Sequence, residues 1–265
     1  MAGDLSTLLD DLRAESEDLD HVVASGGPDA PATPTPAVGW SVGDTIGHLW
    51  FFDRAGRRAL ENPDGFQREV GAVMGDPQAF MADHLLQIRR LGESLLPAWR
   101  EERRLIIAAL EETDPAFRAP WYGPPMSPMS FATARLMETW AHGQDIADGL
   151  GIRRIPTDRL RHIAHLGVRT REFSYQIHGR TPPATPVYVS LTLPSGKPWT
   201  NGDPDAADRI EGPAIDFCLL VTQRRLADDL TLRLTGDAAI EWMSLAQAFA
   251  GVPSSTDRSR KGLGR

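Results

Sequence analysis

Residues 131–150 are apolar on almost every side of the helix that their spacing predicts. Ser127-Pro-Met-Ser130 provides a helix start before this stretch, and Gly149 and Gly151 provide an end after it. A helix that is apolar all round must be covered by other elements, so it belongs inside a bundle. The first half of the chain must therefore fold around this segment.

Two helices that precede this segment are suitable partners for it. Leucine and valine recur at helical spacing over residues 5–23, until Ser25-Gly-Gly-Pro28 ends the pattern. Ser41, with Asp44 three residues later, has the sequence of a helix start, and the helix is expected to run to about Leu60. Both helices carry an apolar face that can pack against residues 131–150.

A long amphipathic stretch over residues 78–112 predicts one more helix before the apolar segment. Asn62-Pro-Asp-Gly65 predicts the turn that separates it from the helix before it. Pro97 lies inside this stretch and should kink or divide the helix, because proline lacks an amide hydrogen and clashes one turn back. Four helices in roughly 150 residues, joined by loops that allow antiparallel neighbours, predict a four-helix bundle.

The pattern changes in the second half of the chain. Residues 186–193 alternate with period two and are rich in β-branched side chains, which predicts a strand, and residues 230–234 predict a second one. Helices are expected over residues 158–178, 213–224 and 237–249. The sequence therefore predicts an α+β protein, with a helical bundle over residues 1–152, a smaller α+β domain over 153–252 and a disordered tail over 253–265.

The composition excludes several classes of partner. The 265 residues carry a formal net charge of -8 without a run of Lys or Arg in the globular body, which argues against binding to nucleic acid. No stretch reaches the ~18 apolar residues of a membrane span, and no leader pattern opens the chain, so we expect no membrane contact and a cytoplasmic location. The lone Cys218 lies in an apolar run and is interpreted as a buried small side chain.

The residues with the clearest chemical potential are Glu138 and His142. They are four apart, so they share one face of the apolar helix, next to small residues that leave room for a ligand. A surface pair of this kind is common and contributes little, so the pair alone does not indicate a site. His48 on another apolar helix would complete a set of two histidines and one carboxylate, which leaves coordination positions open and is typical of catalytic metal sites.

Other polar residues near these three have two possible roles each. Asp44 and Asp145 could each fix the orientation of a histidine, although Asp44 could equally favour the helix start and Asp145 could be solvated. Arg135 could contact an anionic substrate or lie on the surface. His84 could approach the centre of the bundle, but a solvated or structural role is favoured for it.

Two motifs resemble a known family. Trp40-Ser-Val-Gly-Asp-Thr-Ile-Gly-His-Leu49 and Glu138-Thr-Trp-Ala-His-Gly-Gln-Asp145 resemble the DinB-like metal-binding bundle of the mycothiol-dependent maleylpyruvate isomerase family. Leu234-Thr-Gly-Asp-Ala238 resembles its smaller sterol-carrier-protein-like domain. Matched motif by motif, the resemblance implies that His48, Glu138 and His142 hold the metal and form the catalytic centre. Together with the scarcity of lysine, which is typical of high-GC coding, it also implies an actinobacterial source.

The resemblance implies an enzyme that uses a divalent metal, zinc first and iron or nickel as alternatives, with mycothiol as the thiol co-substrate. The reaction would be an isomerisation or a thiol transfer on a small, electrophilic, anionic molecule, with Arg135 as a candidate binding residue. Two other functions stay open from the residues: a hydrolase with a metal-activated water, and a binding protein that holds a metal and a small molecule without turnover. The sequence leaves open whether the chain is a monomer or a homodimer.

Overall fold

The computed structural model describes residues 4–251 and 253. The chain separates into two compact units, with the boundary between Arg154 and Ile155. The first unit is helical, and the second combines helices with a four-stranded sheet, so the predicted α+β class is confirmed. Across the described residues, no helix has the length and apolar character needed to cross a bilayer. The predicted tail lies outside the described residues, apart from Pro253.

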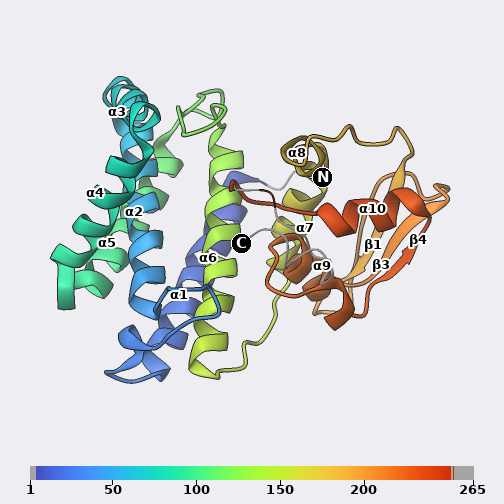
Figure 1. Ribbon diagram of the computed structural model, residues 1–265, viewed down its shortest axis with the longest axis horizontal. Helices are drawn as coiled ribbons and strands as arrows, with labels where there is room; N and C mark the ends of the chain where they lie inside the picture. Colours follow the sequence, from blue (N-terminus) through green and yellow to red (C-terminus); the bar gives the residue numbers. More distant parts are fainter. Residues whose placement is uncertain (1–3, 252, 254–265) are drawn as a thin grey trace. The chain divides into compact units, whose positions relative to one another are not determined.

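The first unit is a bundle of long helices with two shorter ones added at its side (Figure 1). Helix α1 packs against α6 and α2 packs against α5, while contacts of α1 with α5 and of α2 with α6 close the bundle. Helix α6 is buried on several sides, as its apolar sequence predicts. The elements of this unit are α1 (Leu5–Ser25), η1 (Ala30–Ala32), α2 (Val42–Glu61), α3 (Pro63–Gly75), α4 (Pro77–Leu91), η2 (Gly92–Ser94), α5 (Leu95–Glu112) and α6 (Pro128–Leu150).

The turn predicted at Asn62-Pro-Asp-Gly65 is wrong, because these residues begin helix α3. The side chain of Asn62 accepts a hydrogen bond from the amide of Gly65, and Pro63 occupies the first helical position. Asparagine and proline are favoured both in turns and at helix starts, so the same four residues fit either structure. The residues that favour a turn are present, but here they form the start of helix α3.

The long stretch over residues 78–112 is divided, but not at the predicted place. Helix α4 ends at Leu91, and Gly92 adopts a φ of 50° at the start of a short 3₁₀ segment before α5 begins at Leu95. Pro97 lies in the first turn of α5, where a helix does not use the amide that proline lacks. The break therefore falls at the glycine, and the proline marks the new helix start.

The second unit contains a sheet of strand order β2-β1-β3-β4, in which β1 and β3 are parallel and the outer pairs are antiparallel. Helix α9 packs against β1 and β3, and α10 packs against β3 and β4 (Figure 1). The side chain of Cys218 is fully buried, as predicted. The elements are α7 (Leu160–Arg169), α8 (Arg171–Ile177), β1 (Val187–Thr192), β2 (Pro198–Asn201), β3 (Asp208–Pro213), α9 (Ala214–Val221), η3 (Ala227–Asp229), β4 (Arg233–Thr235) and α10 (Asp237–Leu245).

Several predictions for this unit need correction. The helix expected over residues 158–178 is two helices that meet at Thr170, and the strand expected over 230–234 begins only at Arg233. Strands β2 and β3 were not predicted at all. Both are short and polar, and only Ile210 of β3 is buried, so neither shows an alternating apolar pattern. Their pairing with β1 supplies the stabilisation that their sequences do not indicate.

Candidate metal centre

The starts of helices α2 and α6 are fixed by side-chain caps. The hydroxyl of Ser41 accepts a hydrogen bond from the amide of Asp44, and the Asp44 carboxylate accepts one from the amide of Ser41 in return. In α6 the hydroxyl of Ser127 accepts a hydrogen bond from the amide of Ser130, with Pro128 at the first helical position and Gly151 in the left-handed conformation after the last. These caps set where along each helix the polar side chains lie. Asp44 is thereby used at the helix start, which is one of the two roles considered for it.

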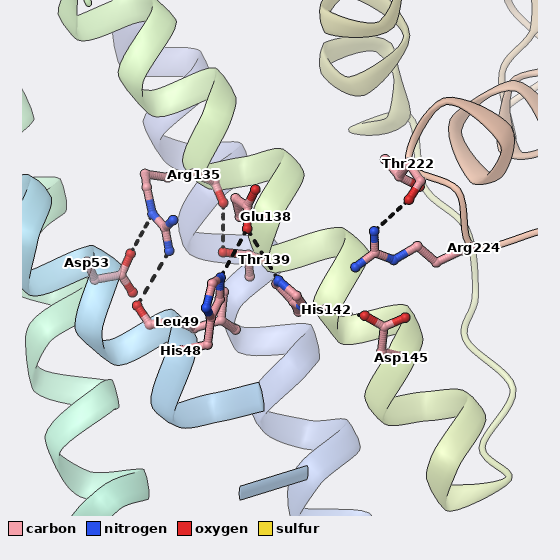
Figure 2. A network of polar contacts seen from close by, with 10 residues as sticks. All are labelled: His48, Leu49, Asp53, Arg135, Glu138, Thr139, His142, Asp145, Thr222 and Arg224. Atoms are coloured by element: carbon pink, nitrogen blue, oxygen red, sulfur yellow. Dashed lines mark hydrogen bonds and ion pairs between the residues drawn. The ribbon is translucent and has the colours of Figure 1, made fainter. Parts of the chain in front are cut away.

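His48 on α2 and the pair Glu138 and His142 on α6 converge at the interface of these helices (Figure 2). The Nε2 atoms of His48 and His142 lie 3.5 Å and 3.3 Å from Oε2 of Glu138. One ligand atom from each of the three residues lies within 4.8 Å of the others. Atoms bound tetrahedrally to one zinc ion at about 2.0–2.2 Å lie roughly 3.3–3.6 Å apart, so both distances from Glu138 match edges of such a tetrahedron.

The three side chains are mostly covered but still reach solvent, with exposed fractions of 19% for His48, 24% for Glu138 and 15% for His142. Burial lowers the pKa of His48 from 6.5 to about 4, so its imidazole is neutral at pH 7. Burial alone would raise the pKa of Glu138, but hydrogen bonds from His142 and His48 outweigh it and hold this pKa well below its ordinary value. A neutral imidazole and an ionised carboxylate are the protonation states that bind a metal ion.

His142 is oriented by a carboxylate on its other side. Its Nδ1 atom lies 3.2 Å from Oδ2 of Asp145, one helical turn further along α6 (Figure 2). Without a metal, Nε2 of His142 donates its hydrogen bond to Glu138; a bound ion would replace that proton, and the tautomer that donates Nδ1–H to Asp145 would then present the Nε2 lone pair to the ion. Of the two aspartates considered from the sequence, Asp145 is the one that contacts a histidine of the site.

Arg135 lies one turn before Glu138, but its guanidinium group forms an ion pair inside the bundle. Its Nε donates a hydrogen bond of 2.8 Å to Asp53 on α2, and its Nη2 lies 3.5 Å from the carbonyl oxygen of Leu49 (Figure 2). Both charged side chains of this ion pair are almost fully buried. The described contacts of Arg135 thus join α2 to α6 next to the site. Its binding of an anionic substrate stays a prediction.

Aromatic side chains lie next to the two histidines of the site. Trp40, directly before the cap of α2, lies parallel to the ring of His142 with centroids 6.2 Å apart, and Phe52 lies 4.6 Å from His48. His84 on α4 also lies close, 6.0 Å from His48. Trp50 and Trp140, which stand two positions from the predicted ligands in the sequence, are buried in the core. The wall of the site is therefore formed by Trp40 and Phe52.

Comparison with known proteins identifies the family. Residues 12–147, about half of the chain, match the mycothiol maleylpyruvate isomerase N-terminal domain. The chain belongs to this family. The resemblance stated from the two sequence motifs is thereby confirmed, and the chain is a member of a family named for an enzyme, as expected. The matched residues include His48, Glu138 and His142.

Two curated relatives and two solved structures extend the comparison beyond the bundle. The uncharacterized proteins MT0041 and Rv0036c of Mycobacterium tuberculosis are each 47% identical over 244 residues, which covers 92% of this chain and 95% of the relative. Two crystal structures of mycothiol-dependent maleylpyruvate isomerase also match. One, of a point mutant, has a TM-score of 0.59 at 13% identity, and the other, with no stated mutation, has a TM-score of 0.58 at 14% identity. They cover 87% of this chain and 93% of the isomerase, so both units share its fold.

Proposed function

We propose that this protein is a metal-dependent enzyme that uses mycothiol, or a closely similar thiol, to isomerise or to modify a small anionic electrophile. The observation that carries the proposal is the convergence of His48, Glu138 and His142, with the two Nε2 atoms 3.5 Å and 3.3 Å from Oε2 of Glu138, as two edges of a coordination tetrahedron would be. Membership of the mycothiol maleylpyruvate isomerase family supports the thiol and the class of reaction. We also propose zinc as the metal, with iron or nickel as alternatives, and a cytoplasmic location.

The three ligand residues would hold a divalent ion with at least one coordination position open to a small molecule. When bound, such an ion lowers the pKa of a thiol next to it, so that the thiol becomes a nucleophile at neutral pH. Asp145 would favour the tautomer of His142 whose Nε2 atom binds the ion, and burial keeps His48 neutral. Trp40 and Phe52 reduce the access of water to the two imidazoles, which strengthens electrostatic interactions there.

The chain has no cysteine that could replace the external thiol. Cys218 is the single cysteine of the sequence, and it lies in α9 of the second unit. It is fully buried, and burial raises the pKa of its thiol well above the ordinary value, so the thiolate does not form at neutral pH. A thiol-dependent reaction of this protein therefore requires a thiol from outside the chain, in agreement with the proposed use of mycothiol.

The experiment that tests the proposal is a turnover assay with the zinc-loaded protein, maleylpyruvate and mycothiol. We expect the cis-to-trans isomerisation or a mycothiol adduct, and we expect neither product when mycothiol is left out or when glutathione replaces it. His142→Ala should abolish turnover, whereas the same change at the exposed His165 should not alter it. Hydrolysis of maleylpyruvate without any thiol would indicate a hydrolase instead, and binding without product would indicate a binding protein.

A further inference from the structure

His84 on α4 is a buried histidine whose hydrogen bonds are missing. The residue is only 3% exposed, and neither Nδ1 nor Nε2 of its ring has a hydrogen-bond partner among the described residues. A neutral imidazole carries one donor and one acceptor, so both groups have left water without compensation. Buried polar atoms in native proteins nearly always have partners, and the exceptions concentrate at functional sites. This residue therefore needs an explanation beyond packing.

The surroundings of His84 are aromatic rather than polar. Its ring stacks on Phe51 with centroids 4.2 Å apart and an angle of 16°, and Phe52 and Phe80 approach it at 5.8 Å and 6.2 Å. A side chain such as leucine would occupy this place without unpaired polar atoms, and would avoid the free-energy cost of desolvating them. Packing alone thus favours an apolar residue at position 84, and the histidine lowers the stability of the fold.

Among the ring contacts of His84, the polar one is with His48, whose ring lies 6.0 Å away. His84 therefore lies next to one of the three residues of the candidate metal centre. It is not a fourth member of that set, because the group of mutually close ligand atoms contains only His48, Glu138 and His142 among the described residues. A molecule that binds beside His48 on the α4 side would therefore lie close to His84.

We propose that His84 hydrogen-bonds an oxygen atom of the small molecule that binds beside His48. The inference rests on the proposed function and assigns a substrate-binding residue to it. A neutral imidazole donates one N–H, which suits the carbonyl or carboxylate oxygen of an oxo acid. Both nitrogens are covered in the structure, so the contact requires a rotation of the His84 side chain among Phe51, Phe52 and Phe80. The hydrogen bond to the ligand then offsets the cost that the unpaired nitrogens impose on the free protein.

The test uses cobalt-loaded full-length protein and pyruvate, an oxo acid that carries both kinds of oxygen. Cobalt absorption reports binding at the metal without any turnover, and elemental analysis reports whether the metal is retained. His84→Leu and His84→Gln are matched in size and differ in polar atoms. We expect His84→Leu to bind pyruvate about tenfold more weakly than the wild type, with His84→Gln between the two. Metal content should be the same in all three, and His165→Leu should behave as the wild type.

Thermal unfolding of the metal-free proteins provides the second readout. Because His84→Leu removes the unpaired polar atoms and His84→Gln keeps polar atoms there, the leucine variant should melt at the higher temperature. Binding and stability should therefore rank the two variants in opposite orders. Equal pyruvate affinity in all proteins, or a wild-type spectrum that pyruvate does not change, would overturn the inference. So would a lower metal content in both variants, which would make His84 a ligand. Failure of the proposed function is recognised separately, as the absence of mycothiol-dependent turnover in the wild type.

Discussion

At the scale of single residues, the site combines Glu138 and His142 of α6 with His48 of α2, and Asp145 contacts His142 from behind. The spacing of Glu138 and His142 places them on one helix face without knowledge of the fold. The distance from His48 to Glu138 and His142 depends on how α2 packs against α6, and no local sequence pattern indicates that packing. Whether Asp44 or Asp145 assists a histidine was also undecided, because a carboxylate in the first helical turn can serve the cap instead.

Asp145→Asn tests the role of the carboxylate behind His142. An amide can present its NH₂ group to Nδ1 and so favour the wrong tautomer, with the proton on Nε2 where the ion should bind. Loss of such a partner lowers metal affinity by about 10–100-fold. Competition with a zinc-binding dye measures this affinity, and Asp148→Asn, three residues further along α6, is the control. If the affinity is unchanged in Asp145→Asn, the carboxylate does not orient His142.

At the scale of elements, glycine and capping residues decide the helix ends and the close approaches of the bundle. The break at Gly92 and the helix start at Asn62 use residues whose preferences fit more than one structure, so their sequence alone was ambiguous. The close contact of α2 with α4 has a clear cause in Gly47. An added Cβ at this position would lie 2.4 Å from Cγ2 of Ile88. This contact brings α4, and His84 with it, next to the site.

Gly47→Ala should therefore destabilise the protein although alanine is the better helix former. The added methyl group forces Ile88 or α4 to move, and overpacking of this kind costs about 1–3 kcal/mol. Gly71 on the exposed side of α3 is the matched control, because a Cβ there meets nothing within 4 Å. Gly71→Ala should stabilise by about 0.5–1 kcal/mol. Urea unfolding measures both, and equal effects of the two substitutions would contradict the tight contact.

The packing of α1 on α5 includes an ion pair that should depend on pH. Asp20 on α1 lies 2.7 Å from Arg100 and 3.1 Å from Arg103 on α5. Burial alone would raise the pKa of Asp20, but these two arginines outweigh it and lower the pKa below 3.8. A lowered carboxyl pKa contributes stability above the unfolded value, and this contribution is lost as the pH falls through the folded value.

Asp20→Asn should accordingly be less stable than the wild type by about 1 kcal/mol at neutral pH. The difference should stay constant down to about pH 5 and shrink below 3.8, where the carboxyl group of the unfolded wild type takes up protons before that of the folded protein does, until both are protonated. Urea unfolding of both proteins over this pH range measures the difference. A gap that persists unchanged in acid would show that the effect of the substitution is not electrostatic.

At the scale of the whole molecule, the fold class follows from the sequence more readily than the details of the second unit do. The change from helical periodicity to an alternating strand pattern at residue 186 predicts α+β, and the structure confirms it. The order β2-β1-β3-β4 was beyond prediction, because β2 and β3 gain their stability from pairing with β1 and not from apolar alternation of their own. The bundle was predictable because each long helix carries its own periodicity.

The central claim is that three side chains from two helices of the first unit hold one metal ion. Elemental analysis of the purified protein tests it most directly, with His142→Ala and the control His165→Ala prepared in the same way. We predict a stoichiometric divalent ion, zinc first, in the wild type and the control, and almost none in His142→Ala, with the same helix content by circular dichroism in all three. The same metal content in the wild type and in His142→Ala would contradict the account.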